Sequence, residues 1–540
     1  MIKTGSAMKR SIKYLLTGPV LGMGAVLLAG CSREDPVSLE GGTAGGGPDG
    51  IAHEMIVLGD QLEDPYSLEN VKAAVSSLYP TRAGRIDLEP THIYARFLPS
   101  NDAELEQLQD LGLELSDHPY DYEIVQEGDY YHDPVLPEQE ITWQYAVVDK
   151  DFAFPEGIRC EILDRCYIPD GDATRADDGI DWDAVEREAF RLTGNAELLE
   201  PATKAQSFQP QGRIAIVDDR VAGGKPIGVS GVRVMTNVFV KFSTTYTDRD
   251  GYYTIPKKYS SRPRYRLVFK NTRGFAIGVN LILLPASVST LGKGSPEGKD
   301  VVITSDSDRK LFCRSVVNNA VYDYIGRCGD GDMDIAPPPS GLRLWLFQNM
   351  DASSAAMLHH GAIIDTDLMG EFLRGCGWLV KLFAPDLTIG VKNHDDYSSI
   401  YSSTVHELAH CSHYARVGNT YWNRYISYIG IGFLTSGGAT YGDGTGTWAG
   451  YCEVGEMWAY YMESKLFAER YGGSMPAFGT SWWFFPQIFR YLDQRGFTRS
   501  ELFAALTPDV VSRETLQKKL VELYPDRNSI IHQVFTRYAP

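Results

Sequence analysis

The stretch of sequence that decides the fold is STVHELAHCS, residues 403–412. Its only charged residue is Glu407, which predicts a buried helix, because a solvated helix carries charged side chains on its free face. On a helix, His406 and His410 are one turn apart and share one face. Their imidazole nitrogens can therefore meet a single tetrahedral zinc ion, so the pattern predicts a metal centre.

Glu407 stands directly beside this histidine pair and can hydrogen-bond a water held by the metal. Zinc lowers the pKa of such a water, and a neighbouring carboxylate can take its proton as the water attacks a carbonyl carbon. The sequence therefore predicts Zn²⁺ as cofactor and Glu407 as general base. The alternative is a surface helix with two histidines in register, which the uncharged flanks disfavour.

A zinc site of this kind needs a third protein ligand from another segment. The downstream segment CEVGEMWAYYME, residues 452–463, follows a glycine-rich loop. Together with the HExxH pattern, Glu456 and Ala459 resemble the second helix of gluzincin metallopeptidases, over about residues 388–463. The resemblance implies that Glu456 ligates zinc and that the small alanine allows close helix packing. Glu453, one turn earlier, stays open as the alternative ligand.

The chain departs from that family at one position. Many gluzincins place a carboxylate four residues after the ligand to support a histidine, whereas this chain has Tyr460 there. The support is therefore altered or comes from elsewhere. The resemblance also implies a tyrosine or histidine as oxyanion donor; Tyr451 is the candidate, and Tyr441 and Tyr460 compete with it. His413 is expected to be a packed or supporting histidine.

Residues 300–540 are rich in helix-forming and aromatic patterns and are expected to form a mainly helical, zincin-like metallopeptidase domain, with a strand at 387–391 just before the HExxH helix. Residues 206–285 alternate apolar and polar side chains between Gly/Asp turns, which predicts a small antiparallel β-sandwich. The segments 231–234 and 247–253 resemble carboxypeptidase regulatory-like domains. The aspartates of the second segment are expected to form a turn rather than a calcium site.

Residues 51–205 read as an α+β module. Strand and helix patterns follow one another, with helices expected at 67–78, 101–111 and 181–192 and a strand at 92–98. No catalytic cluster is evident there, so a packing or partner-binding role is expected. The predicted fold class is α+β, with several domains.

The N-terminus carries a targeting signal. Basic residues precede an apolar run that ends in Leu-Ala-Gly-Cys, so residues 1–30 resemble a bacterial lipoprotein signal peptide and Cys31 its lipidated residue. Residues 31–50 are glycine-rich and predict a flexible tether. Lipid on Cys31 would hold the protein at the outer membrane or cell surface. The acidic residues 32–35 fit either a surface-export signal or a solvated tether.

Composition narrows the choice of partners. The 540-residue chain has a formal net charge of -19, which speaks against nucleic acid, because phosphate binding needs clustered Lys and Arg. Protein or peptide is the expected substrate. The seven cysteines beyond Cys31 are an odd number at irregular spacing and do not predict a disulfide framework. The competing hypothesis is an inactive surface binding lipoprotein of a nutrient- or glycan-uptake system, which the intact Glu407 disfavours.

Overall fold

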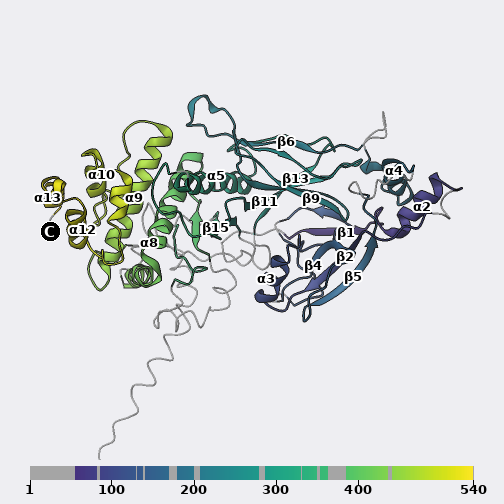
Figure 1. The fold of residues 1–540 in the computed structure, drawn as a ribbon, viewed down its shortest axis with the longest axis horizontal. Helices are drawn as coiled ribbons and strands as arrows, with labels where there is room; N and C mark the ends of the chain where they lie inside the picture. Colours follow the sequence, from purple (N-terminus) through teal and green to yellow (C-terminus); the bar gives the residue numbers. More distant parts are fainter. Residues whose placement is uncertain are drawn as a thin grey trace, which may run out of the picture.

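The computed structural model shows an α+β fold with several sheets and a helical C-terminal part (Figure 1). The signal peptide and the anchor Cys31 with its tether lie outside the described residues. So do residues 371–383, for which the sequence pattern also predicts a helix. Within the described part of the chain, no helix combines the length and the apolar character that a membrane crossing needs. The structure describes residues 55–81, 86–128, 130–137, 140–169, 179–199, 207–278, 286–329, 331–348, 353–362, 385–435 and 441–538.

The N-terminal part contains a small antiparallel sheet. Its central strand β2 (His92–Leu98) pairs with β4 (Gln144–Asp149) on one side and β5 (Arg159–Cys166) on the other. The remaining elements are β1 (Val57–Gln61), β3 (Tyr122–Gln126), α2 (Leu68–Leu78), α3 (Asp102–Asp110) and α4 (Trp182–Leu192). The three helices begin where the sequence predicts them. At each start the N-cap side chain, that of Ser67, Asn101 or Asp181, accepts a hydrogen bond from a backbone N–H of the first turn.

The middle of the chain is rich in strands. They are β6 (Gln211–Ile216), β7 (Ile227–Gly228), β8 (Val232–Val238), β9 (Lys241–Tyr246), β10 (Tyr252–Thr254), β11 (Arg264–Asn271), β12 (Ala276–Ile277), β13 (Val288–Lys293), β14 (Val301–Ile303), β15 (Arg343–Phe347) and β16 (Leu387–Gly390). One sheet has the order β16-β15-β12-β11-β8-β9, with β13 also on β11. A second has the order β10-β6-β14, with β7 on β6. The carboxylate of Asp248 accepts hydrogen bonds from two backbone N–H groups of the turn before β10, in agreement with the expected turn.

These sheets cross the boundary expected at residue 285. Past that residue, β13 pairs antiparallel with β11, and β14 pairs in parallel with β6. Strand β12 pairs in parallel with β15, which pairs in parallel with β16. The middle and C-terminal parts therefore share one hydrogen-bonded sheet, and parallel pairs occur where a purely antiparallel sandwich was expected. The sequence pattern marks strands but not which strands pair across a long connection.

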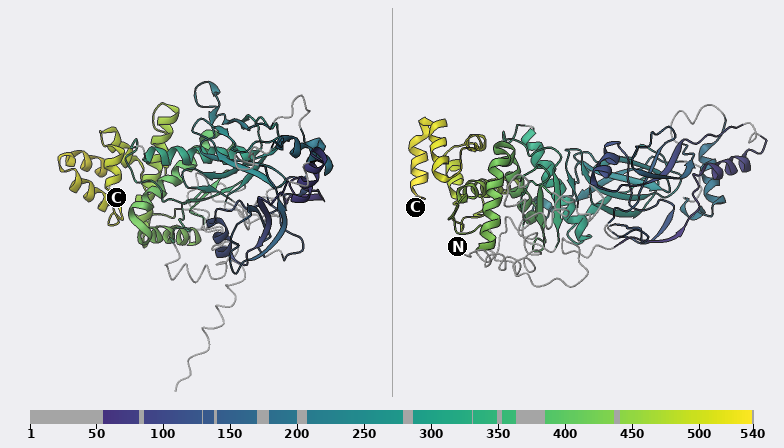
Figure 2. Two further views of the ribbon diagram at one scale, coloured as in Figure 1. Left: turned by 45° about the vertical axis from the view of Figure 1, so that its right-hand side comes forward. Right: turned by 90° about the horizontal axis from the view of Figure 1, so that it is seen from below.

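The C-terminal part is helical. Its elements are α5 (Arg309–Gly329), α8 (Tyr397–Thr435), α9 (Ala449–Tyr471), α10 (Gln487–Gln494), α11 (Arg499–Ala504), α12 (Arg513–Leu523) and α13 (Asn528–Thr536). α8 is interrupted at Gly418, whose φ of 78° and ψ of 178° are not helical. The C-terminal helices and the N-terminal module lie at opposite ends of an elongated molecule, with the strands of the middle region between them (Figures 1 and 2).

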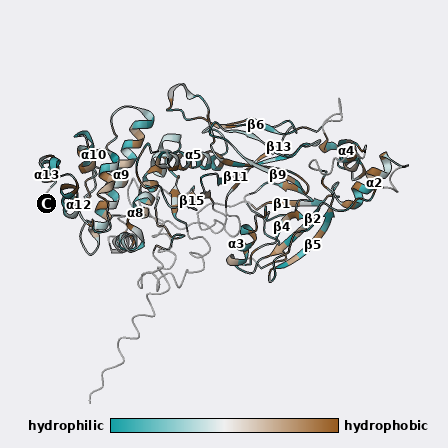
Figure 3. Ribbon diagram, viewed as in Figure 1, coloured by the Kyte–Doolittle hydropathy of each residue, from teal (hydrophilic) through white to brown (hydrophobic). Residues whose placement is uncertain are grey.

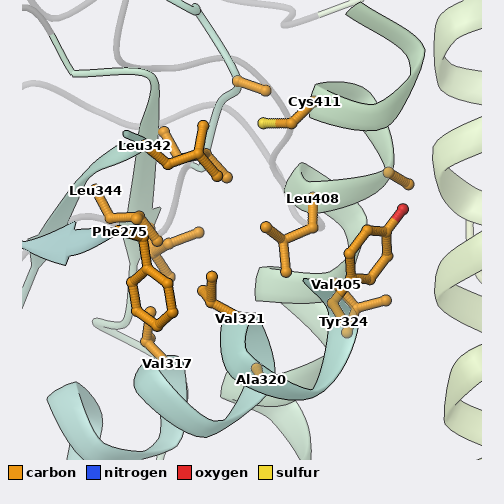
Figure 4. Packing of buried hydrophobic residues seen from close by; sticks show 14 of the residues in the cluster. Phe275, Val317, Ala320, Val321, Tyr324, Leu342, Leu344, Val405, Leu408 and Cys411 are labelled. Atoms are coloured by element: carbon orange, nitrogen blue, oxygen red, sulfur yellow. The ribbon is translucent and has the colours of Figure 1, made fainter. Parts of the chain in front are cut away.

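Helix α8 packs against α5 and against strand β16 of the sheet. Leu408 points from α8 toward Val321 on α5, Val405 lies beside Tyr324 of α5, and Leu344 of β15 lies across the cluster (Figure 4). These side chains are at most 1% exposed. Residues three apart share a helix face, so this contact turns the other face of α8, which carries His406, toward α9.

Almost every side chain of α9 between residues 451 and 464 is buried. Hydrophobic and hydrophilic residues are mixed along α8 and α9 (Figure 3). Several of the polar ones are buried, among them His406, His410 and Glu456. The indole N–H of Trp458 donates to the Ala409 carbonyl across this contact at 3.2 Å. Buried polar side chains cost free energy unless they are paired, so their presence between these two helices indicates a functional site.

A buried ion pair joins α4 to β9. Nζ of Lys241 lies 3.2 and 3.3 Å from the two carboxylate oxygens of Glu186, and the Tyr66 hydroxyl donates to the same carboxylate at 2.5 Å. Lys241 and Glu186 are 2% and 5% exposed. Removal of one partner leaves the other charge buried and uncompensated, which is the costly case.

We expect Lys241→Met to lower the free energy of unfolding by about 3–5 kcal/mol. Urea denaturation followed by circular dichroism measures the loss. The double variant Lys241→Met/Glu186→Leu is the control, since replacement of both charges by apolar groups is close to neutral. A single variant as stable as the wild type would show that the pair contributes no stability.

Candidate metal centre

Two helices bring three ligand atoms together in the interior. His406 and His410 extend from α8 and Glu456 extends from α9, which packs beside it (Figure 1). Nε2 of His406 lies 3.4 Å from Oε2 of Glu456, and Nε2 of His410 lies 3.5 Å from Oε1 of the same carboxylate. The three side chains are 4%, 0% and 0% exposed.

These separations fit a common metal ion. Ligand atoms at about 2.0–2.1 Å from one tetrahedral zinc ion lie about 3.3 Å apart. A direct N–H···O hydrogen bond would bring donor and acceptor to about 2.9 Å, shorter than both observed distances. Two imidazole nitrogens and one carboxylate oxygen are also a donor set that zinc accepts. The residues present therefore suit Zn²⁺ in both spacing and chemistry.

Glu407 is 1% exposed and follows His406 on α8. Its negative charge is one of the causes that raise the pKa of His406, so the carboxylate acts on the same site. Three buried carboxyl groups, those of Glu407, Glu456 and Glu463, thus raise the pKa of His406. This surplus of acidic groups favours a cation between them.

The ionisation of the histidines follows from their neighbours. Burial alone would lower the pKa of His406, but the adjacent carboxylates of Glu456 and Glu463 outweigh burial and raise the pKa to about 10. Burial, together with the charge of His406, lowers the pKa of His410 below its usual value. Burial would raise the pKa of Glu456, but the two histidines hold it well below the usual range. Glu456 is therefore a carboxylate, the form that binds a metal.

The support for His406 comes from Glu463. Nδ1 of His406 lies 3.2 Å from Oε2 of Glu463, and the Ser402 hydroxyl donates to Oε1 at 2.6 Å. Glu463 lies seven residues, or two helical turns, beyond Glu456, so both carboxylates share one face of α9. Glu463 was not predicted, because the family pattern places the supporting carboxylate one turn after the ligand. The i+7 spacing of the two glutamates was the available signal.

Tyr460 occupies the position between these carboxylates. Its ring centre lies 4.4 Å from that of His406, in an edge-to-face contact. Its hydroxyl lies 3.1 Å from the hydroxyl of Tyr441. Tyr460 therefore packs against the histidine that Glu463 orients.

The structure places Tyr451 away from the three ligands. Its ring packs on Tyr421 at 4.7 Å between centres, and its hydroxyl accepts a hydrogen bond from Arg424. Tyr425 instead donates its hydroxyl to Oε1 of Glu456 at 2.6 Å. Tyr451 lies within α9 rather than before it, and its ring and hydroxyl contact Tyr421 and Arg424. The role of Tyr451 as oxyanion donor therefore stays a prediction.

Glu453, the alternative ligand, serves a different contact. Its Oε2 accepts the backbone N–H of Arg513 at 2.8 Å, at the start of α12. His413 is fully buried between Tyr421 and Trp422, with ring centres 5.1 and 5.7 Å away. Burial lowers the pKa of His413 to about 3, so its ring is neutral. The histidine packs in the core, in line with the expectation for it.

Comparison with known proteins adds no assignment. No protein-family model matches the chain. No curated protein and no solved structure matches it either. The chemistry of the centre therefore follows from five buried residues of α8 and α9: His406, Glu407, His410, Glu456 and Glu463.

Proposed function

We propose that the protein is a zinc-dependent peptidase that hydrolyses peptide bonds of extracellular protein or glycoprotein substrates. His406, His410 and Glu456 would hold the metal, and Glu407 would act as general base. The observation that carries the proposal is the spacing of 3.4 and 3.5 Å between the histidine nitrogens and the oxygens of Glu456, with Glu407 next to His406 on the same buried helix. This is the arrangement that metal-assisted hydrolysis needs.

The chain's own residues have distinct roles in this reaction. When bound, zinc would supply Lewis-acid polarisation of the scissile carbonyl and acidify a water. Glu407 would take the proton of the attacking water and later give it to the leaving amine. Glu463 would fix the ring orientation of His406 through Nδ1, and Tyr425 would fix the carboxylate of Glu456.

The finer architecture belongs to the same proposal. Residues 300–540 would be a zincin-like domain of gluzincin type, with residues 206–285 a carboxypeptidase regulatory-like unit joined to it through the shared sheet. The signal at 1–30 and lipid on Cys31 would anchor the protein to the bacterial outer membrane or cell surface. Such a location would bring extracellular proteins within reach.

Metal analysis and a peptide library test the proposal together. Protein lacking residues 1–31 is expected to carry about one zinc ion per chain at the histidine site and to cleave peptides from a mixed library. A chelator should abolish cleavage, and added zinc should restore it. Protein that binds no zinc under gentle preparation would overturn the metal assignment.

One observation favours a second candidate function. His406, Glu407, His410 and Glu456 are all at most 4% exposed, as in a metal site that stabilises a fold. In that case the protein would be a surface binding lipoprotein with a structural zinc ion. Full zinc occupancy without cleavage of any library peptide would support this second function and contradict the first.

The supporting carboxylate offers a quantitative test. Glu463→Gln is expected to lower zinc affinity by about 10–100-fold, because loss of the carboxylate leaves the His406 ring less firmly oriented. Competition with a chromophoric chelator measures the affinity. Glu469→Gln is the matched control on the same helix, since that carboxylate pairs with Arg327 and Arg499 instead. Equal affinities in the two variants would remove Glu463 from the site.

A further inference from the structure

A second group of ligating side chains lies at the other end of the molecule. An oxygen of Asp64, an oxygen of Asp164 and the sulfur of Cys166 all lie within 4.8 Å of one another. Asp64 belongs to the connection between β1 and α2, and the other two residues lie near the end of β5. Cys166 is fully buried and is a free thiol.

The fold fixes these residues without any ion. Asp164 and Cys166 are two apart on β5, so their side chains lie on the same side of the strand. The β1–α2 connection is pinned to that strand, because Ser67 forms a β-bridge with Cys166 and the N–H of Tyr167 donates to the Tyr66 carbonyl at 2.9 Å. The three ligating groups are therefore held together by backbone pairing.

The carboxylate of Asp64 is only half satisfied. Its Oδ1 accepts the backbone N–H of Tyr66 at 2.9 Å. Its Oδ2 is buried and has no hydrogen-bond partner among the described residues. A buried carboxylate oxygen without a partner is costly, so it calls for a proton or a cation beside it. One carboxylate oxygen of Asp64 belongs to the cluster that contains the Cys166 sulfur.

The charges around the cluster favour a cation. A cavity of about 600 Å³ adjoins it, and its lining carries five carboxylates and a single arginine: Glu63, Asp64, Glu69, Asp121, Asp164 and Arg96. The guanidinium of Arg96 is taken by Glu161, with hydrogen bonds of 2.6 and 2.9 Å. A bound cation would relieve this accumulation of negative charge.

We propose that Asp64, Asp164 and Cys166 form a second metal site, which takes a zinc-like divalent transition-metal ion. A thiolate with two carboxylates suits zinc, whereas calcium and magnesium prefer oxygen ligands alone. Three protein ligands leave a fourth position open toward the cavity. Binding would release the thiol proton of Cys166 to solvent, since a coordinating thiol is deprotonated. The site is independent of the histidine centre, which contains no sulfur ligand.

Cobalt(II) alone is the probe, added to the full chain after residue 31. The wild type is expected to develop a thiolate-to-cobalt charge-transfer band in the near ultraviolet, because cobalt occupies zinc sites and only a sulfur ligand gives this band. Cys166→Ser is expected to lose it. Cys160→Ser is the matched control on the same strand and should keep it. The histidine centre would bind cobalt through nitrogen and oxygen, so the band does not depend on whether that centre holds a metal.

Two outcomes overturn the proposal. The first is a wild type without the band at saturating cobalt, and the second is a band that survives in Cys166→Ser. If Cys166→Ser does not fold, Asp64→Asn replaces it, because its remaining oxygen can still accept the N–H of Tyr66. That variant should need about tenfold more cobalt for half-saturation. Loss of a residue that only supports a ligand already lowers metal affinity by about this factor. Unchanged half-saturation contradicts the site.

Discussion

Glu407→Gln is expected to retain its zinc and to lose peptide hydrolysis by about 10²–10⁴-fold or more. Glutamine keeps the shape of the side chain on α8, whereas it cannot take the proton of the attacking water. His406, His410 and Glu456 are unchanged, so metal content should stay at the wild-type value. Cleavage of casein or of a mucin-derived peptide, normalised to bound zinc, measures the effect.

A control variant tests whether the loss of activity comes from proton transfer by Glu407. Glu453→Gln makes the same chemical change one helix away, at a carboxylate that binds the backbone of Arg513. It should cleave peptides at close to the wild-type rate. A Glu407→Gln protein that is as active as the wild type would contradict the role of Glu407 as base. Metal content would show whether the centre itself had survived.

Glu456→Ala is expected to remove nearly the whole zinc ion from the histidine site, from about one per chain to near zero. Two histidines alone leave two of four coordination positions without a protein ligand. Protein dialysed against a weak chelator and analysed by mass spectrometry of the metal gives the content. Zinc in the site of Asp64, Asp164 and Cys166 is counted separately, in a Cys166→Ser background.

Glu453→Ala is the matched comparison for this ligand. Both glutamates are on α9, three residues apart, and both are buried. Only Glu456 lies 3.4 and 3.5 Å from the histidine nitrogens. Retention of zinc in Glu456→Ala with its loss in Glu453→Ala would reverse the assignment. Loss in both would indicate that α9 had moved rather than that one ligand was missing.

Much of the fold could be predicted from patterns within short segments of the sequence. The helix with His406 and His410 and the strand before it could be predicted, because periodicity and the absence of charge are properties of short segments. Helix starts at Ser67, Asn101 and Asp181 follow from capping, which is equally local. The parallel pairing of β12 with β15 could not be predicted, since about 65 residues separate the two strands and loop length carries little information on pairing.

The candidate site likewise contains residues that could be predicted from the sequence and residues that only the tertiary structure brings together. Glu456 could be proposed from a resemblance that spans two helices, and the geometry around it is consistent with that choice. The role of Glu463 depends on which face of α9 meets α8, which is a tertiary property. Tyr425 was missed for the same reason, since nothing near it in the sequence marks contact with Glu456. Asp64 and Cys166 are about 100 residues apart, and only the pinned β1–α2 connection brings them together.

The sheet that continues from β11 through β12 to β15 and β16 limits how the protein can be divided. A recombinant fragment starting at residue 300 would leave β15 without its β12 partner and expose backbone N–H and C=O groups along a new edge. Such edges promote association between chains. β14 would also lose its partner β6. For expression and crystallisation, the smallest sensible unit around the histidine centre therefore begins near residue 207 rather than at the helical part.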